Sequence, residues 1–226
     1  MKWYAEAGKT PSQITLLLLK QPKIEKSRKL CLYYLFEESV HRHPNTECIW
    51  SREGCYTWKQ SYDLVNQYGQ WYLSQGVKPG DLVAFYLQNS PDFLFAWLGL
   101  WSIGAAPAMI NYNLAGKALI HCVKVPKSKL ILVDDDAELR GRIEDEREEL
   151  EGELGIKIVF MDSSTLSEIR SGKAERPEDI YREEVKGNSP LGLLYTRLVF
   201  FAVCKIRWLT NHQVELQGYR KDVVLR

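Results

Sequence analysis

The clearest candidates for chemistry in this sequence are three consecutive carboxylates, Asp134, Asp135 and Asp136. They directly follow Lys129–Val133, a run typical of a buried strand. Carboxylates gathered at the end of a strand could hold Mg²⁺. The same residues also suit a solvated turn that leads into a helix, because Asp side chains accept hydrogen bonds from the N–H groups of a first helical turn. We favour this second interpretation and predict no metal ligand.

Histidine and cysteine show no spacing typical of a metal centre or a catalytic pair. His41 and His43 lie near the predicted C-terminal end of a helix, where a partly positive imidazole suits the helix dipole. The five cysteines contain no Cys-x-x-Cys pair; they are Cys31, Cys48, Cys55, Cys122 and Cys204. We interpret all five as reduced thiols of an intracellular chain. No general base or nucleophile is assigned, so we predict no catalytic residue.

Two of the cysteines flank a predicted hairpin formed by residues 47–50 and 55–58. In the register that we predict, Cys55 faces Trp50 and Cys48 faces Thr57. The two thiols therefore do not lie opposite each other.

The bulk composition excludes several classes of function. The 226 residues carry a formal net charge of +1, which gives no electrostatic reason to expect a nucleic-acid partner. The chain is long enough to bury a sizeable core. Two apolar runs, Ile14–Leu19 and Leu191–Cys204, fall short of the roughly 20 residues that a spanning helix needs, and Arg197 interrupts the second. We predict a chain without a transmembrane segment, soluble or peripheral to a membrane.

We predict that Gly80–Asn113 forms the centre of the domain, which positions the residues of a functional site. Its first part, Asp81–Leu87, is apolar enough for a buried strand. Ser90 and Pro91 then suit the N-cap and the first position of a helix that is apolar almost all round. Gly104 suits the left-handed residue that ends this helix, and a second strand follows it.

Strands and helices also alternate on either side of this stretch. The other predicted elements are helices at 30–43, 58–75 and 114–124, an exposed acidic helix that runs to Glu153 and is laced with i,i+4 pairs, a short helix opened by Asp162, and strands at 105–110, 129–133, 157–161 and 190–196. Thr57 and Asn113 are the expected N-caps of the second and third helices. This alternation predicts an α/β domain with a mainly parallel sheet and helices on both faces.

The polar stretches suggest how the chain is divided. Residues 1–27 are predicted to form a loosely ordered arm, with contact to a membrane surface as the alternative. Residues 28–196 hold the predicted domain, in which Ser171–Gly187 is a polar connection before the last strand. Residues 197–226 form a divergent tail.

Several phrases of the sequence resemble the AMP-forming acyl-CoA synthetases of the adenylating-enzyme superfamily, and the nearest branch is that of the fatty-acid transport proteins and very-long-chain acyl-CoA synthetases. The phrases are Arg42–Asn45, Cys48–Gly54, Tyr56–Trp58, Gly76–Asp81, Asn89–Pro91, Gly104–Pro107 and Ile110–Gly116, with Leu119 and His121 downstream. The resemblance runs from about Leu30 to Thr196. It implies the truncated front half of the N-terminal domain of such an enzyme.

The resemblance implies a two-step reaction, activation of an acid followed by transfer of its acyl group. A complete member activates a long-chain fatty acid with ATP and Mg²⁺ to an acyl-adenylate, and then transfers the acyl group to coenzyme A. Such enzymes are often associated with endoplasmic reticulum, peroxisomal or plasma membranes. The family wraps the triphosphate with a loop of the pattern Tyr-Thr-Ser-Gly-Thr-Thr-Gly-x-Pro-Lys, which follows a strand directly. Small residues there let backbone N–H groups approach the phosphates, and the Lys supplies charge.

The sequence departs from the family at this loop. Tyr195 and Thr196 match its start, but Arg197–Cys204 follows with no Ser-Gly-Thr-Thr-Gly. Gly218 and Lys221 resemble the end of the motif, which suggests that residues 197–217 are an insertion that splits the loop; a chance match is the alternative. The predicted cofactor-binding remnants are therefore Tyr195, Thr196, Gly218 and Lys221, and we expect no productive binding of ATP, Mg²⁺ or coenzyme A by this chain.

The leading interpretation is an inactive N-terminal fragment of a fatty acyl-CoA synthetase. The alternative is a non-catalytic interaction module that binds a full-length synthetase or a membrane surface. In either case, we expect Leu193, Leu194 and the helix Phe93–Trp101 to expose some apolar surface. Such surface favours association or aggregation of the chain. A flavodoxin-like nucleotide domain is the least favoured interpretation, because Gln88–Pro91 lacks the glycines of its phosphate turn.

Overall fold

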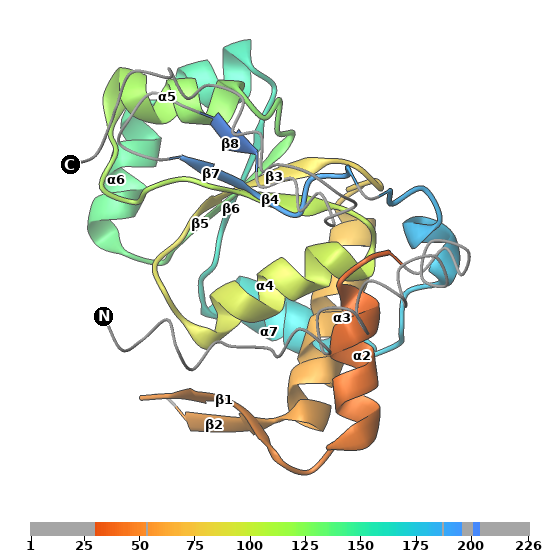
Figure 1. Ribbon diagram of the computed structural model, residues 1–226. Coiled ribbons are helices and arrows are strands. Elements are labelled where there is room, and N and C mark those ends of the chain that lie inside the picture. Colours follow the sequence, from red (N-terminus) through yellow and green to blue (C-terminus); the bar gives the residue numbers. More distant parts are fainter. Residues whose placement is uncertain (1–29, 53, 187, 196–200, 204–226) are drawn as a thin grey trace, which may run out of the picture.

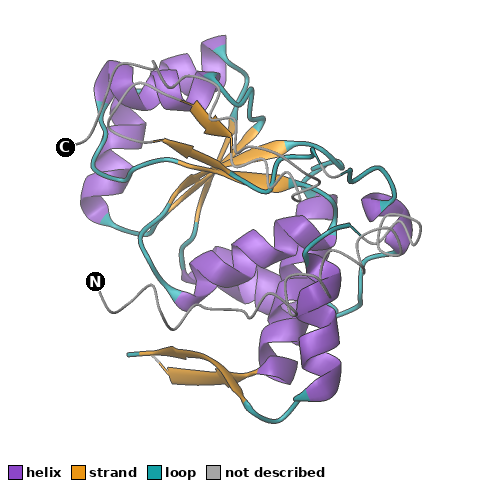
Figure 2. Ribbon diagram, in the orientation of Figure 1, coloured by secondary structure: helices purple, strands orange, loops and turns teal. Residues whose placement is uncertain are grey.

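The computed structural model describes residues 30–52, 54–186, 188–195 and 201–203, the last three as backbone only. Two layers of helices enclose one β-sheet, and a two-stranded hairpin stands apart from it (Figures 1 and 2). The predicted arm at 1–27 and most of the predicted tail at 197–226 lie outside the described residues.

The sheet has six strands in the order β6-β5-β3-β4-β7-β8. They are β3 (Leu82–Tyr86), β4 (Ala106–Met109), β5 (Leu130–Val133), β6 (Lys157–Phe160), β7 (Leu193–Tyr195) and β8 (Phe201–Val203). All neighbouring strands are parallel except β7 and β8, which pair antiparallel at one end. The mainly parallel sheet predicted from the sequence is therefore confirmed.

Helices cover both faces of this sheet, as predicted (Figure 1). On one side lie α2 (Tyr33–Arg42), α3 (Trp58–Ser74), α4 (Pro91–Ser102) and α7 (Ser163–Ser171); on the other lie α5 (Gly116–Lys124), α6 (Ala137–Asp145) and the π-helical segment η1 (Glu148–Glu153). Each side has its own apolar core. Successive residues of a strand point to opposite faces, so Phe85 enters the α4-side core while Ala84 and Tyr86 enter the α5-side core.

The central strand–helix–strand unit forms as the sequence predicts. The Ser90 hydroxyl accepts the backbone N–H of Phe93 at 3.1 Å, and Pro91 opens α4. Gly104 follows the helix with φ +73°, a left-handed conformation that glycine adopts without strain. Its carbonyl accepts the N–H of Gly80 at 2.9 Å, which joins the end of α4 to the start of β3.

The start of α3 is confirmed, but one detail of the hairpin before it is wrong. Thr57 and Gln60 form a reciprocal capping box at the N-terminus of α3. In the hairpin of β1 (Glu47–Ser51) and β2 (Gly54–Thr57), Trp50 faces Cys55 as predicted. Thr57, however, pairs with Glu47 and not with Cys48, because a bulge between Glu47 and Ile49 takes Cys48 out of the ladder.

The predicted N-cap of α5 is also wrong. The helix begins at Gly116 with Ala115 as N-cap, and not at Leu114 after Asn113. The reason is a local turn, since the side chain of Asn111 accepts the N–H of Asn113 at 2.9 Å and its carbonyl accepts the N–H of Leu114 at 3.0 Å. Ala115 then has an extended backbone, with φ −143° and ψ 167°, so the helix starts only after it.

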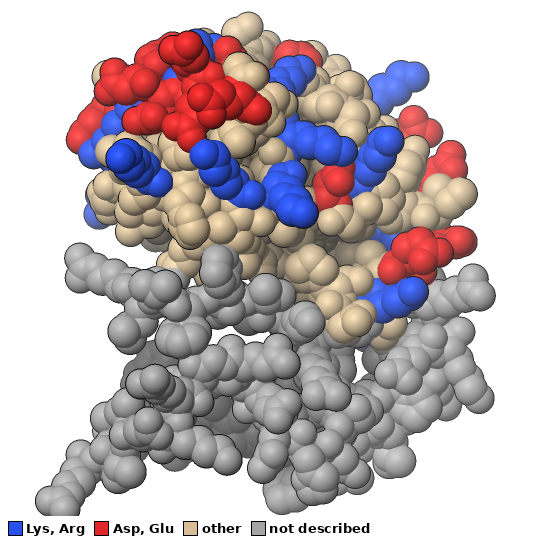
Figure 3. Space-filling model, turned by 90° about the horizontal axis from the view of Figure 1, so that it is seen from above, with Lys and Arg blue, Asp and Glu red and all other residues tan. Residues whose placement is uncertain are grey.

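The acidic segment is less exposed than the sequence suggests. The predicted i,i+4 pairs are present, since Arg142 pairs with Glu138 and Arg147 pairs with Glu151 at 2.8 Å. The segment is nevertheless divided between α6 and η1, and its apolar residues are buried in the α5-side core; they are Leu139, Ile143 and Leu150. Figure 3 shows the carboxylates gathered on one part of the surface.

Two glycines bring α3 and α4 into close contact. A Cβ atom at Gly99 of α4 would lie 2.6 Å from Cβ of Tyr68 and 3.2 Å from the carbonyl of Val65. A Cβ atom at Gly69 of α3 would lie 2.2 Å from Oγ of Ser102. At Gly99 a larger residue requires movement of a helix, because Cβ of Tyr68 is fixed to the α3 backbone, whereas at Gly69 the close atom is a hydroxyl that can rotate. Gly99 is therefore the position that allows α3 and α4 to approach closely.

A fully buried arginine ties the segment before β7 to the helices. This segment, interpreted as a polar connection, contains the short 3₁₀-helix η2 (Asp179–Arg182). The guanidinium of Arg182 donates to the carbonyl of Ser102, to the carbonyl of Pro177 at 3.0 Å and to Asp179 at 2.6 Å. It also lies 4.7 Å from the ring centroid of Tyr33. The polar connection is therefore mostly exposed, but Arg182 fixes it to the core.

The carboxylate in this network predicts a pH dependence. Burial alone would raise the pKa of Asp179, but hydrogen bonds from Arg182, Arg176 and Tyr34 outweigh burial and lower the pKa to about 2. An unfolded Asp has a pKa of about 3.9, so the stabilisation by Asp179 is present above about pH 4 and is lost as the pH falls towards 2. We expect Asp179→Asn to lose less stability than the parent chain over that interval.

Urea unfolding midpoints between pH 6 and pH 2.5 measure this difference. The control is Asp145→Asn, at an exposed position at the end of α6. The same slope below pH 4 in all three chains would contradict the assignment.

Candidate functional site

The carboxyl edge of the parallel sheet is the candidate site, because open α/β sheets bind ligands outside the carboxyl ends of their strands. Strands β3, β4, β5 and β7 run in the same direction, so the residues that follow them meet at one edge. The edge includes Tyr86 of β3, Asp134 after β5 and Tyr195 of β7. Each of these side chains has a partner within the protein.

The three consecutive carboxylates at this edge are all engaged. Asp134 accepts the backbone N–H of Gln88 at 2.8 Å and so joins the end of β5 to the loop after β3. Asp135 pairs with Arg140 at 2.7 Å. Asp136 is the N-cap of α6. No group of acidic, histidine or cysteine side chains suited to a metal ion occurs among the described residues. The predicted turn and helix N-terminus are confirmed.

Tyr86 and Arg142 stabilise the loop after β4. The hydroxyl of Tyr86 donates to the carbonyl of Leu114 at 2.6 Å. The guanidinium of Arg142 donates to the carbonyl of Tyr112 at 2.6 Å and to the Tyr86 hydroxyl at 3.4 Å. The hydrogen bond with Tyr86 raises the pKa of Arg142. These contacts fix the shape of the edge.

Of the four predicted remnants of the phosphate loop, the structure places Tyr195. Its ring packs against the α5-side core, and its hydroxyl donates to the carbonyl of Cys122 at 2.6 Å. Burial raises the pKa of this phenol, so the hydroxyl stays protonated and remains a donor. Thr196, Gly218 and Lys221 lie outside the described residues.

The described residues do not by themselves fit a nucleoside triphosphate. A phosphate site needs N–H donors or cations aimed at an open space. At this edge the carboxylates of Asp134, Asp135 and Asp136 are engaged as above, and Arg142 already binds Tyr112, Tyr86 and Glu138. We assign no step of a reaction to these residues.

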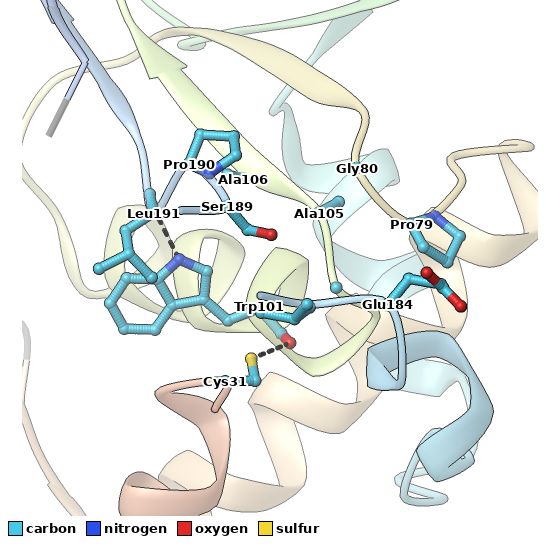
Figure 4. A pocket seen from close by; sticks show the side chains of 12 residues that line it. Cys31, Pro79, Gly80, Trp101, Ala105, Ala106, Glu184, Ser189, Pro190 and Leu191 are labelled. Carbon is cyan, nitrogen blue, oxygen red and sulfur yellow. Dashed lines mark hydrogen bonds between the residues drawn. The ribbon is translucent and has the colours of Figure 1, made fainter. Parts of the chain in front are cut away.

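A small cavity lies at the opposite edge of the sheet, near the amino ends of β3 and β4 (Figure 4). Its volume is about 100 Å³, well below the roughly 300 Å³ of the smallest typical ligand pockets. The indole N–H of Trp101 donates to the carbonyl of Leu191 at 2.8 Å, and the thiol of Cys31 donates to the carbonyl of Trp101 at 3.1 Å. Its lining comes from distant parts of the sequence, so no local pattern could predict it.

The fold is that of part of the N-terminal domain of acyl-CoA synthetases. A fatty acyl-CoA synthetase from Mycobacterium tuberculosis superposes on 74% of this chain and 32% of its own, with a TM-score of 0.66 and 21% sequence identity. The family model of AMP-binding enzymes matches residues 36–196. The chain belongs to this family of AMP-binding enzymes.

Two curated relatives are similar to this chain in sequence. The isopenicillin N epimerase component 1 of Hapsidospora chrysogena is 40% identical over 140 residues, which are 62% of this chain and 23% of the relative. The very long-chain fatty acid transport protein of Cochliobolus heterostrophus is 30% identical over 170 residues, which are 75% of this chain and 26% of the relative. The chain thus spans about a quarter of the length of each of them.

The described part of the chain contains no helix with the length and apolar character that a membrane crossing requires.

Proposed function

We propose that this chain forms the front part of the nucleotide-binding domain of a fatty acyl-CoA synthetase and that, alone, it does not form an acyl-adenylate. The family match over residues 36–196 supports the first half of the proposal. The sequence after Thr196 supports the second half. Arg197–Cys204 contains none of the Ser, Thr and Gly residues that a loop around ATP phosphates needs.

In this proposal the chain supplies the scaffold of the carboxyl edge. Asp134 holds the loop after β3, and Tyr86 and Arg142 hold the loop after β4. ATP, Mg²⁺ and coenzyme A belong to the reaction of the whole enzyme, and no described residue is assigned to them.

Exchange of labelled pyrophosphate into ATP, measured on the purified chain with a long-chain fatty acid, tests the proposal. We expect no exchange above a blank without fatty acid, because the phosphate loop is not continuous in the sequence. A full-length fatty acyl-CoA synthetase under the same conditions is the positive control. Exchange that depends on the fatty acid would show that the chain is active.

The acid substrate of the proposed synthetase is inferred from the names of two relatives. One relative is named as a very long-chain fatty acid transport protein and another as a component of isopenicillin N epimerase. The exchange assay therefore includes isopenicillin N beside the fatty acid. Activity with either acid would contradict the proposed inactivity.

A second candidate function is a non-catalytic interaction module, favoured by exposed apolar side chains. Trp50 on the hairpin is 79% exposed and Leu194 of β7 is 41% exposed. The prediction that Leu193 is exposed is wrong, because this side chain is only 4% exposed. Flotation with anionic liposomes and co-purification with a full-length synthetase test this candidate, and a Trp50→Ser variant that binds equally well would count against the hairpin as the contact.

A further inference from the structure

The cavity at the amino edge of the sheet has one wall of residues with little or no side chain (Figure 4). Gly80 precedes β3, and Ala105 and Ala106 lie where β4 begins. Other walls include Trp101 of α4 and Leu191 of the segment before β7. These side chains do not fill the space between the walls, which measures about 100 Å³.

The polar groups on these walls already have partners within the protein. The backbone N–H groups of Gly80, Ala105 and Ala106 all donate to backbone carbonyls, at 2.9 to 3.1 Å. The indole N–H of Trp101 and the thiol of Cys31 are also hydrogen-bonded, as described above. A buried water needs two to four polar partners, and these walls offer few. The cavity therefore favours an apolar occupant over water.

The remaining polar side chains lie at the rim of the cavity. Glu184 is exposed, and Figure 4 shows its carboxylate beside Pro79. Ser189 is half-buried, and its hydroxyl accepts the N–H of Lys186 at 2.9 Å. No lysine or arginine occurs among the described residues that line the cavity. An anion would meet the like charge of Glu184, and a cation would lose its water for a single exposed carboxylate, so an uncharged occupant fits best.

The volume of the cavity limits the size of the occupant. In another protein, an apolar cavity of about 150 Å³ binds one molecule of benzene. The cavity described here has about two thirds of that volume, which corresponds to about four carbon atoms. The walls of an unfilled cavity lack dispersion contacts, and an apolar occupant of this size gains them.

We propose that this cavity is a binding site for a small, uncharged, apolar molecule of about three or four carbon atoms. The occupant contacts Trp101 at the end of α4 and Leu191 before β7, so its binding stabilises the attachment of β7 to the rest of the domain. The site lies at the opposite edge of the sheet from the candidate functional site. This inference does not depend on the proposed function.

Nuclear magnetic resonance of the full chain with ¹³C-labelled alanine methyl groups tests the proposal, with cyclopropane as the probe. We expect the methyl signals of Ala105 and Ala106 to shift and to saturate with a dissociation constant on the order of 1 mM, near the limit for three heavy atoms. The internal controls are Ala84, buried in the α5-side core, and Ala118, exposed on α5. Unshifted signals at Ala105 and Ala106, or equal and unsaturated shifts at all four alanines, would overturn the proposal.

Val185→Phe is the second test, because Val185 lines the cavity and a larger ring fills it. We expect cyclopropane to bind at least tenfold more weakly, read from the methyl signal of Ala106. Ala118→Leu adds carbon atoms at an exposed position and should keep the parental dissociation constant. Ala105→Val fills the cavity from another wall and carries the same expectation if Val185→Phe does not fold. Parental binding in a folded variant with a filled cavity would contradict the assigned site.

Acetate tests the apolar character of the site, because it has four heavy atoms but carries a charge. We expect no saturable shift of the Ala105 and Ala106 methyl signals at acetate concentrations about a hundred times the cyclopropane dissociation constant. Saturation by acetate at the same concentration as cyclopropane would contradict the proposed class of ligand.

Discussion

Replacement of Arg182 by Met is expected to lower the free energy of unfolding by about 2 to 4 kcal/mol, because two backbone carbonyls in the core lose a charged hydrogen-bond donor. The side chain is fully buried and donates to Ser102, Pro177 and Asp179. Met fills similar space but donates nothing, so the carbonyls of Ser102 and Pro177 lose a hydrogen bond inside the core.

Urea unfolding at pH 7 measures this loss, and two variants separate its causes. Arg182→Lys keeps the charge but cannot reproduce the planar guanidinium contacts, so an intermediate loss is expected. Arg176→Met removes a partly exposed guanidinium that pairs with Glu37 and Asp179, and a smaller loss is expected. A loss below about 1 kcal/mol in Arg182→Met would show that Arg182 does not stabilise the core.

Replacement of Gly99 by Val is expected to cost about 3 kcal/mol, because new atoms must enter the contact between α3 and α4. Even the first added carbon would stand 2.6 Å from Tyr68, and the nearby carbonyl of Val65 belongs to a helix backbone that cannot move alone. The two helices must therefore separate, which also weakens the packing of Phe95 and Leu100 behind them.

Gly141→Ala in α6 is the matched control, since no atom lies within 4 Å of a Cβ built there. Alanine is the better helix former by about 1 kcal/mol, so this variant should be more stable than the parent. Urea midpoints of the two variants should move in opposite directions. If Gly99→Val unfolds at the parental midpoint, the close approach of α3 and α4 does not limit stability.

The parts of the fold that the sequence predicts well depend on neighbouring residues. Ser90 and Pro91 start α4, and Thr57 with Gln60 starts α3, because caps act within a single turn. The apolar run at Lys129–Val133 becomes β5 because every residue from Leu130 onward is buried. The N-cap role of Asp136 is predictable for the same reason, since its carboxylate accepts the N–H groups of Glu138 and Leu139.

The parts that the sequence does not predict depend on residues far apart in the chain. Arg182 lies in a polar stretch, and nothing near it indicates that Ser102 and Tyr33 will enclose its guanidinium. The bulge at Cys48 follows from strand pairing and not from composition. At the candidate site, the contact of the Tyr195 hydroxyl with the carbonyl of Cys122 joins residues 73 positions apart, so no local pattern predicts it.

Each of the two cores contains one buried cysteine whose chemical modification reports on the opening of that side of the sheet. Cys31 belongs to the α4-side core and Cys122 to the α5-side core. Burial raises the pKa of Cys31 to about 11 and also raises the pKa of Cys122, so neither thiol is an effective nucleophile in the closed protein. A thiol reagent therefore modifies each one when its own side of the sheet opens. The labelling rates of these two native cysteines separate the opening of one face from cooperative unfolding of the whole domain.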